Sequence, residues 1–483
     1  MASNGYPKDS YSAGSPTSEY EKWTQHIIDI ENEPKDLKTT EWNIYKVPCN
    51  LRKFDKAEEA YTPQLVSIGP IHHGLLPNLN PMQEQKLRYL VLFWRLVEKQ
   101  TIDMGKFKKF LEDEEQNIRK RYAENLCDKF NTEKLVEMML LDSVFIMELF
   151  LRIQNVEKYP DDIIVRQPWL NKSIQRDLLL LENQIPLLIL EKLYATFVPN
   201  SRKKHATSTF IELARDYFDC YQTYHTNGKC DVEINMNCGT SKKGDSTSGE
   251  KTGSSDSKGQ SPKHFTDLIR SFYICKDLKE FKKWLPLKTA TKLRESGVSF
   301  EKGNNRRLVH IKFKKVKILS WFRCLGCIIP KFTYFKARLE IPELKVDDST
   351  ECVLRNLIAF EQCHYPSQPF ICSYVSFIDS LIETKDDVEL LVEKEVIVHE
   401  LGSATEVATL VNGLCKHVVT DKTCYADILN SLNKHYQRRW YRTMAALRMV
   451  YFRDTWRGSS TVVGIIVLMF TIINFCRNFG LLP

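Results

Sequence analysis

The stretch that decides the fold is LVEMMLLDSVFIMEL, residues 135–149. Its apolar residues recur at intervals of three, four and seven, which predicts a helix with one apolar face made by Leu135, Met138, Phe145, Ile146 and Leu149. Asp142 falls on that face, seven residues after Leu135. A carboxylate there must find a partner or shift its pKa upward, so we expect Asp142 to be a buried, partnered group.

Helical patterns continue on both sides of this stretch. Pro81 stands where a first helical turn tolerates proline, and one face of the helix behind it is predicted to carry Leu87, Leu90, Val91, Trp94 and Val97. Further along, Asp177 leads into an apolar run that Pro186 is expected to kink or restart. The region before residue 238 is therefore predicted to be helical.

Short strands are predicted only in the later part of the chain, over residues 298–300, 308–313 and 339–346. Two helices are predicted to follow, each opened by a capping pair: Asp348 with Glu351, and Ser403 with Glu406. The fold class is therefore predicted to be mainly α with a small β-sheet (α+β), and the last apolar run of the chain is predicted to form a single C-terminal transmembrane helix.

Composition shifts divide the chain into segments. Residues 239–262 are rich in Ser, Gly, Lys, Thr and Asp and lack large apolar residues, so they are predicted to form a linker. The predicted order is a polar disordered N-terminus (1–40), a helical block (41–238), the linker (239–262), a block with a small sheet and helices (263–457), a transmembrane helix (458–476) and a short tail (477–483).

Length, charge and cysteine content narrow the class of protein. The 483 residues are 43% hydrophobic and 27% charged, enough for a sizeable core, and the net charge is +8. The N-terminus has no apolar run typical of a signal peptide. Without a signal peptide, the fourteen irregularly spaced cysteines are expected to be reduced thiols in the cytosol and not a disulfide framework. Cys324 and Cys327 lack the second ligand pair that a zinc ribbon needs, and acylation is an alternative role for them.

Residues 458–476 carry no charged side chain and approach the about 20 apolar residues that span a bilayer. The predicted anchor includes Gly458, Ile465, Leu468, Phe470 and Phe475. Basic residues precede it, and those expected at the membrane surface are Arg438, Arg439, Arg442, Arg453 and Arg457. Since positive charge stays on the cytoplasmic side, the body is predicted to be cytosolic, at the plasma membrane or an endomembrane.

Several motifs resemble one plant family. Ile44-Tyr45-Lys46-Val47-Pro48 and the run from Tyr61 to Gly74 (YTPQLVSIGPIHHG) resemble the opening of the family called domain of unknown function 247. Further blocks follow in the family's order: LDSVFI (141–146), LENQIP (181–186) and RNLIAFEQ (355–362). Ser143-Val144 replaces the family's usual Gly-Cys, and residues 314–336 look like an insertion. The resemblance implies a plant membrane protein without established catalytic residues; some grass members are associated with pollen self-incompatibility.

Five residues are candidates for chemistry: His72, His73, Asp142, Glu182 and Glu361. Adjacent histidines point apart, so this pair is expected to fix a turn by hydrogen bonds, with a metal-ligand or base role as the alternative. Asp142 and Glu361 lie on apolar helix faces, and Glu182 precedes Pro186 in a polar cluster, where ion pairs or hydrogen bonds compete with acid–base catalysis. Nucleophile-elbow, P-loop, zinc-protease and dinucleotide motifs do not occur in the sequence. No metal or cofactor is predicted.

The stretch from Lys302 to Arg338 is basic and interleaved with aromatic residues. It is interpreted as a surface for anionic lipid or as a solvated face, and nucleic acid is the least favoured partner. Taken together, the sequence predicts a membrane-anchored, non-enzymatic interaction or recognition protein with a protein partner, and the family resemblance implies a role in signalling. The alternative is a membrane-bound hydrolase or transferase that uses the buried carboxylates with His72 or His73.

Overall fold

The computed structural model describes residues 41–53, 57–76, 79–98, 104–123, 126–205, 208–221, 261–274, 280–305, 307–317, 335–438 and 455–478. Residues 43–483 form one compact unit and residues 1–42 another. The predicted disordered N-terminus (1–40), nearly all of the predicted linker (239–262) and the Cys324–Cys327 pair lie outside the described residues. Mainly helical structure with small sheets confirms the predicted α+β class.

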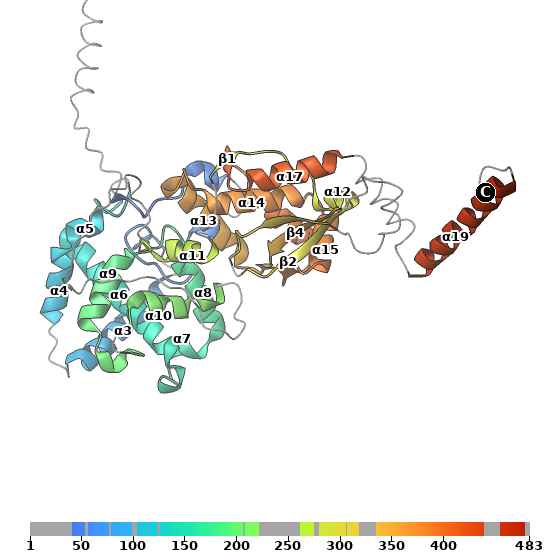
Figure 1. Ribbon diagram of the computed structural model, residues 1–483. Helices are drawn as coiled ribbons and strands as arrows, with labels where there is room; N and C mark the ends of the chain where they lie inside the picture. Colours follow the sequence, from blue (N-terminus) through green and yellow to red (C-terminus); the bar gives the residue numbers. More distant parts are fainter. Residues whose placement is uncertain are drawn as a thin grey trace, which may run out of the picture. The chain divides into compact units, whose positions relative to one another are not determined.

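The longer helices before residue 222 are α3 (Asn80–Glu98), α4 (Met104–Asp113), α6 (Thr132–Gln154), α8 (Pro168–Leu178), α9 (Leu187–Phe197) and α10 (Phe210–Tyr217) (Figure 1). Shorter ones are α2 (Ala57–Tyr61), α5 (Glu115–Arg119), α7 (Ile163–Arg166) and the 3-10 turns η2 (Cys49–Arg52), η4 (Val156–Lys158), η5 (Asn200–Arg202) and η6 (Asp219–Tyr221).

Helix α6 is the central element, because α3, α4, α9 and α10 all contact it. It is capped by Asn131, whose side chain accepts a hydrogen bond from the N–H of Lys134. All five predicted face residues, Leu135, Met138, Phe145, Ile146 and Leu149, are buried, which confirms the prediction from residues 135–149. The helix is in fact buried around most of its circumference, as expected of a core helix.

Helix α3 exists where the sequence predicts it, and of its predicted apolar face Trp94 is buried and Leu90 half-buried, but the prediction is wrong for Leu87 and Val91. Leu87 and Val91 are 52% and 48% exposed, whereas Tyr89 and Phe93 are fully buried. The helix is turned because the aromatic rings supply more apolar area, and because the ammonium of buried Lys86 finds a carboxylate inside the body. Simple apolar periodicity cannot anticipate a lysine on the inner face.

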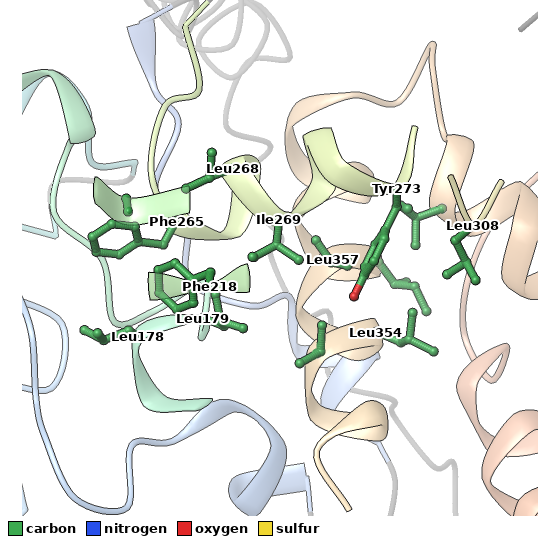
Figure 2. Packing of buried hydrophobic residues seen from close by; sticks show 14 of the residues in the cluster. Leu178, Leu179, Phe218, Phe265, Leu268, Ile269, Tyr273, Leu308, Leu354 and Leu357 are labelled. Carbon is green, nitrogen blue, oxygen red and sulfur yellow. The ribbon is translucent and has the colours of Figure 1, made fainter. Parts of the chain in front are cut away.

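Helix α11 (Phe265–Tyr273) lies at the centre of the apolar contacts between residues before 222 and residues after 280. Figure 2 shows Phe265 beside Phe218 and Leu179, Ile269 beside Leu357, and Tyr273 near Leu308 and Leu354. A single hydrophobic cluster accordingly includes residues from Ile44 to Leu432.

After α11 the chain forms α12 (Ala290–Glu295), α13 (Thr350–His364), α14 (Phe370–Leu381), α15 (Lys385–Glu393), α16 (Ala404–Leu414) and α17 (Ala426–Gln437). Helix α16 begins at its predicted cap, where Ser403 accepts a hydrogen bond from Glu406 N–H. For α13 the predicted cap Asp348 is wrong. The N-cap is Ser349, because Asp347 binds the Ser349 N–H and the hydroxyls of Ser349 and Thr350.

Three small sheets accompany these helices. β2 (Val298–Gly303), β4 (Phe335–Pro342) and β3 (Lys312–Lys317) lie in the order β2-β4-β3, with β2 parallel and β3 antiparallel to β4. The register pairs Phe300 with Leu339 and Phe313 with Leu339. Two-stranded pairs are formed by β1 (Lys282–Lys283) with β7 (Lys422–Thr423), and by β5 (Leu344–Val346) with β6 (Ile397–His399).

The last described element is α19 (Thr455–Asn478). Across the part of the chain that the structure describes, no helix has both the length and the apolar character that crossing a membrane requires. The predicted transmembrane helix over 458–476 is therefore not supported, although these residues are helical within α19.

Candidate functional site

Several polar residues of the quoted motifs meet around one segment, residues 43–53 and 57–74, here called the N-terminal segment. Most of it has no regular secondary structure, so its backbone groups need partners from elsewhere. Buried side chains of α3, α6 and α8, together with Glu182 and Asn183, supply them. The site is therefore built from side-chain contacts to backbone.

Asp142 of α6 holds the turn at Gly69. Its Oδ2 accepts the Gly69 N–H at 2.9 Å, and its Oδ1 lies 2.5 Å from Lys86 Nζ, which also donates to the Ser67 carbonyl at 2.5 Å. Asp142 is 2% exposed and Lys86 is not exposed. Gly69 has φ +71°, and a side chain there would place its Cβ 2.6 Å from the Gln184 carbonyl. The turn thus needs glycine as well as the carboxylate.

Glu182 binds the start of the N-terminal segment. Its Oε1 accepts the Val47 N–H at 2.6 Å and an Arg52 N–H at 2.7 Å, and its Oε2 lies 3.2 Å from His72 Nε2. Burial raises the pKa of the Glu182 carboxyl, but the contact with His72 together with the hydrogen bond and charge of Arg52 outweighs burial, so the pKa lies below its ordinary value. Glu182 is therefore an ionised, fully coordinated carboxylate.

Asp177 and Asn183 complete these contacts. The polar cluster with Asn183 was expected to satisfy backbone groups at the Pro186 kink, whereas Asn183 binds the N-terminal segment, and no contact was predicted for Asp177. Asp177 accepts the N–H groups of Gln64, Leu65 and Val66 at 2.7–3.1 Å. Asn183 accepts the Ile68 N–H at 2.6 Å and donates to the Val66 carbonyl at 2.9 Å. A usable signal was the polar run 182–184 beside Asp177 in an otherwise apolar stretch, but its partners lie more than 100 residues away in sequence.

Glu361 of α13 is separate from this group. It lies 2.7 Å from Arg270 Nε of α11 and accepts the Cys372 N–H of α14 at 2.9 Å. Burial raises the pKa of the Glu361 carboxyl, and the Arg270 charge opposes that rise only in part. Arg270 stacks on Tyr365, with its guanidinium carbon 3.9 Å from the ring centroid. Glu361 therefore joins three helices.

The two histidines differ in environment. His72 contacts Glu182, as described, whereas His73 is half-buried and packs edge-on against Phe130, with 5.7 Å between ring centroids. Burial lowers the pKa of His73. Of the five candidates for chemistry, only His72 and Glu182 are thus brought into contact. Among the described residues, no group of three or more His, Cys, Asp or Glu side chains could hold a metal ion.

A cavity of about 170 Å³ is present elsewhere, lined on one side by α8, η6 and α11 and on the other by β5 and α13. Its polar lining includes Lys172, Tyr221, Lys345 and Asp347. Lys172 Nζ lies 3.7 Å from Asp347, whose Oδ1 already accepts hydrogen bonds from Ser349 and Thr350. None of the predicted site residues lines it.

The basic stretch from Lys302 to Arg338 is partly neutralised by acids. Lys302 pairs with Glu343, Lys314 lies 2.6 Å from Glu340, and Arg338 lies 3.3 Å from Glu301. Lys312 and Lys315 of β3 are exposed. Of the five predicted membrane-surface arginines, Arg438 is exposed at the end of α17. Arg439, Arg442 and Arg453 lie outside the described residues, and Arg457 lies in α19 with its side chain not described.

The fold and these contacts define a mainly helical α+β body that is braced internally by buried polar side chains. The chain belongs to the DUF247 family, described as plant protein of unknown function, whose family model matches residues 44–470.

Two similar proteins come from Arabidopsis thaliana. The chain is 28% identical to UPF0481 protein At3g47200 over 449 residues, covering 89% of this chain and 84% of the relative. It is 26% identical to Putative UPF0481 protein At3g02645 over 499 residues, covering 92% of each. No solved structure matches the chain. The family resemblance predicted from the quoted motifs is confirmed.

Proposed function

We propose that this protein is a non-enzymatic recognition protein that is attached to a membrane through α19 and binds a protein partner in signalling. The proposal that the protein is not an enzyme rests on one observation: the candidate carboxylates are buried and already bound to other groups of the protein. Asp142, Glu182 and Glu361 each hold backbone N–H groups and a different cation, and each is at most 2% exposed. A carboxylate so coordinated and covered is poorly placed to exchange protons with a substrate.

Membrane attachment is supported by the surface of α19. Nine large apolar side chains between Val463 and Phe475 are 47–64% exposed, among them Leu468, Phe470 and Phe475 of the predicted anchor. Gly458 and Ile465 lie in the same helix. An apolar surface of this extent calls for an apolar environment, and the preceding basic residues suit anionic headgroups. The occupant proposed for this surface is a lipid bilayer.

Deleting residues 455–483 should move the protein from the membrane fraction of plant cells to the soluble fraction. The control replaces Leu188 and Val398, two exposed apolar residues of the body, with Gln. Retention of the deleted protein in membranes after alkaline and high-salt washing would contradict attachment through α19.

Contact with anionic lipid is proposed for the surface formed by β3 and the end of α17. Lys312, Lys315, Lys434 and Arg438 are exposed there. The pKa of Lys315 is lowered, first by partial burial and then by the charges of Arg438 and Lys434, so these cations lie near one another. Binding to anionic liposomes should weaken with salt and in Lys312→Glu/Lys315→Glu, but not in the control Lys108→Glu/Lys120→Glu. Equal binding to neutral liposomes would contradict the proposal.

The recognition role is tested by affinity capture from plant membranes with the full chain as bait. We expect a specific protein to be recovered at stoichiometric amounts. The second candidate, a hydrolase or transferase, is favoured only by the His72–Glu182 contact. If the protein is a hydrolase or transferase, His72→Gln should abolish substrate turnover but still capture the partner. If it is a recognition protein, neither the wild type nor His72→Gln should turn over a substrate.

A further inference from the structure

The cavity between α8 and α13 has an apolar part. Its volume is about 170 Å³, and the side chains of Leu308, Leu344, Val353 and Leu354, all of them buried, line it. A cavity of about 150 Å³ with aliphatic and aromatic walls is large enough to bind benzene. The space among these four side chains therefore suits one small ring or a short branched chain.

A buried hydroxyl of the same lining lacks a hydrogen-bond partner. Tyr273, at the end of α11, is 8% exposed, and Figure 2 shows its ring near Leu308 and Leu354. In the part of the chain that the structure describes, no group forms a hydrogen bond with its hydroxyl. Since buried hydroxyls are normally hydrogen-bonded, this one is available to a molecule in the cavity.

The Tyr273 hydroxyl lies at the polar end of the cavity. Burial raises the pKa of Tyr273, and the neighbouring Cys220 and Asp347 raise it further, so the group is a neutral donor. Cys220 and Asp347 also interact electrostatically with the ammonium groups of Lys172 and Lys345. The hydroxyl and both lysines are therefore gathered around the same two residues.

The ionised side chains of the lining have a net positive charge, with Lys172 and Lys345 against Asp347. Burial raises the pKa of the Asp347 carboxyl, but its hydrogen bonds at the start of α13 and the Lys172 charge outweigh burial, so the carboxyl is ionised. Lys345 Nζ lies 2.7 Å from Glu400, whereas Lys172 Nζ lies 3.7 Å from Asp347, beyond hydrogen-bonding distance. The Lys172 ammonium can therefore turn to a bound anion.

We propose that this cavity binds a small organic monocarboxylate whose apolar body is about the size of one ring. The carboxylate accepts hydrogen bonds from the Tyr273 hydroxyl and the Lys172 ammonium, and the apolar body packs against Leu354 and its neighbours. A dianion such as phosphate fits less well, because it would face the Asp347 carboxylate and leave the apolar walls uncovered. The site is distinct from α19 and from the proposed recognition of a protein partner.

Four compounds test the ligand class by isothermal titration calorimetry with the full-length protein. Benzoate and phenylacetate combine a ring with a carboxylate, phenylacetamide has the shape of phenylacetate without its charge, and acetate has no ring. We expect benzoate or phenylacetate to bind at millimolar concentration or below. Phenylacetamide should bind at least about tenfold more weakly than phenylacetate, and acetate should give no measurable heat.

Two variants locate the binding in the cavity. Tyr273→Phe keeps the ring and removes only the unpartnered hydroxyl, so it should weaken carboxylate binding about tenfold without lowering the midpoint of urea unfolding. Lys172→Ala should also weaken binding about tenfold. The matched control is Lys108→Ala, since Lys108 is likewise exposed and likewise lies far from its carboxylate, at 4.0 Å from Glu112. It should leave the affinity unchanged.

The cysteines provide a second measurement that does not depend on a variant. Cys220 lines the cavity and is exposed, and Cys49 of η2 is exposed elsewhere. Iodoacetamide alkylation of each can be followed by peptide mass spectrometry. A saturating concentration of the bound carboxylate should slow alkylation of Cys220 severalfold and leave that of Cys49 unchanged.

Four results would overturn the proposal: binding of neither benzoate nor phenylacetate, equal binding of phenylacetate and phenylacetamide, full affinity in both Tyr273→Phe and Lys172→Ala, or equal protection of Cys220 and Cys49. Failure of the affinity capture, by contrast, would remove the recognition function and leave this site standing. Carboxylate binding can likewise fail while the captured partner remains.

Discussion

Replacing Glu182 with Ala should destabilise the protein severely, because one carboxylate serves several buried groups. The change leaves the buried Val47 N–H without its acceptor, a loss of about 1–3 kcal/mol. It also removes the charge partner of Arg52, and breaking a buried pair costs about 3–5 kcal/mol. The Arg52 side chain keeps 17% exposure and a second contact to Glu58, so we expect about 3 kcal/mol in all. Against a typical total of about 5–15 kcal/mol this is a large fraction.

The chain provides a matched control for this change. Glu58 contacts the same arginine at 3.3 Å, but its side chain is 79% exposed. Glu58→Ala should therefore cost less than about 0.5 kcal/mol, as exposed ion pairs do. The assay is urea unfolding of the full-length protein followed by circular dichroism, comparing midpoints at constant slope.

The same pair of variants has a pH signature. The native pKa of Glu182 lies below its ordinary value of 4.5, so its contribution is fully present above pH 4.5 and is lost as pH falls through the lowered native pKa. The difference in unfolding free energy between wild type and Glu182→Ala should shrink below pH 4.5. Equal and small losses of unfolding free energy in Glu182→Ala and Glu58→Ala at pH 7 would refute the stabilising role of the Glu182 contacts.

Three further outcomes are expected. Gly69→Ala should lower the unfolding free energy by about 3 kcal/mol in urea, because its Cβ would meet the Gln184 carbonyl. Gly74→Ala has a similar φ but open space, so it should lower this free energy by about 1 kcal/mol, and equal losses would contradict the steric argument. Burial lowers the pKa of His264 to about 3, so the native state resists its protonation and loses stability as pH falls from 6.5. His264→Gln should remove about 2 kcal/mol of the loss between pH 6.5 and 4.5, and an unchanged pH profile would contradict this. Finally, Asn171 begins the glycosylation sequon Asn171-Lys172-Ser173, and its side chain accepts a hydrogen bond from the Tyr217 hydroxyl. In a cytosolic body Asn171 should carry no glycan, so an endoglycosidase-sensitive mobility shift in plant cells would place the body outside the cytosol.

The apolar periodicity and capping residues of the sequence predicted those helices whose apolar face is the face that packs into the core. Residues 135–149 become the core helix α6 because its periodicity matches its burial. Ser403 caps α16 as expected because both partners lie within one turn. The helix α3 was also predicted, but its orientation was not, since the decisive contact joins Lys86 to Asp142 across 56 residues.

The need for partners at the candidate site was predictable, but their identities were not. An Asp on an apolar helix face implies a buried partner, and Asp142 has one. The partners of Glu182 and Asp177, however, are backbone groups of Val47 and Gln64, and any residue type offers such groups. Side-chain identity therefore carries no trace of which N–H a carboxylate will bind.

Because the N-terminal segment contacts residues far along the chain, it is synthesised well before its partners during translation. Glu182 follows Val47 by 135 residues, and Asn356, whose amide donates to the Ala60 carbonyl, follows Ala60 by 296. At about 5–20 residues per second, the ribosome needs about 15–60 s to add those 296 residues. Val66 and Ile68, fully buried in the finished protein, lack the side chains that accept their N–H groups until Asp177 and Asn183 have been added, 111 and 115 residues later. The N-terminal segment is thus synthesised well before the residues that fix it, and chaperones that bind exposed apolar chain should bind this segment during translation.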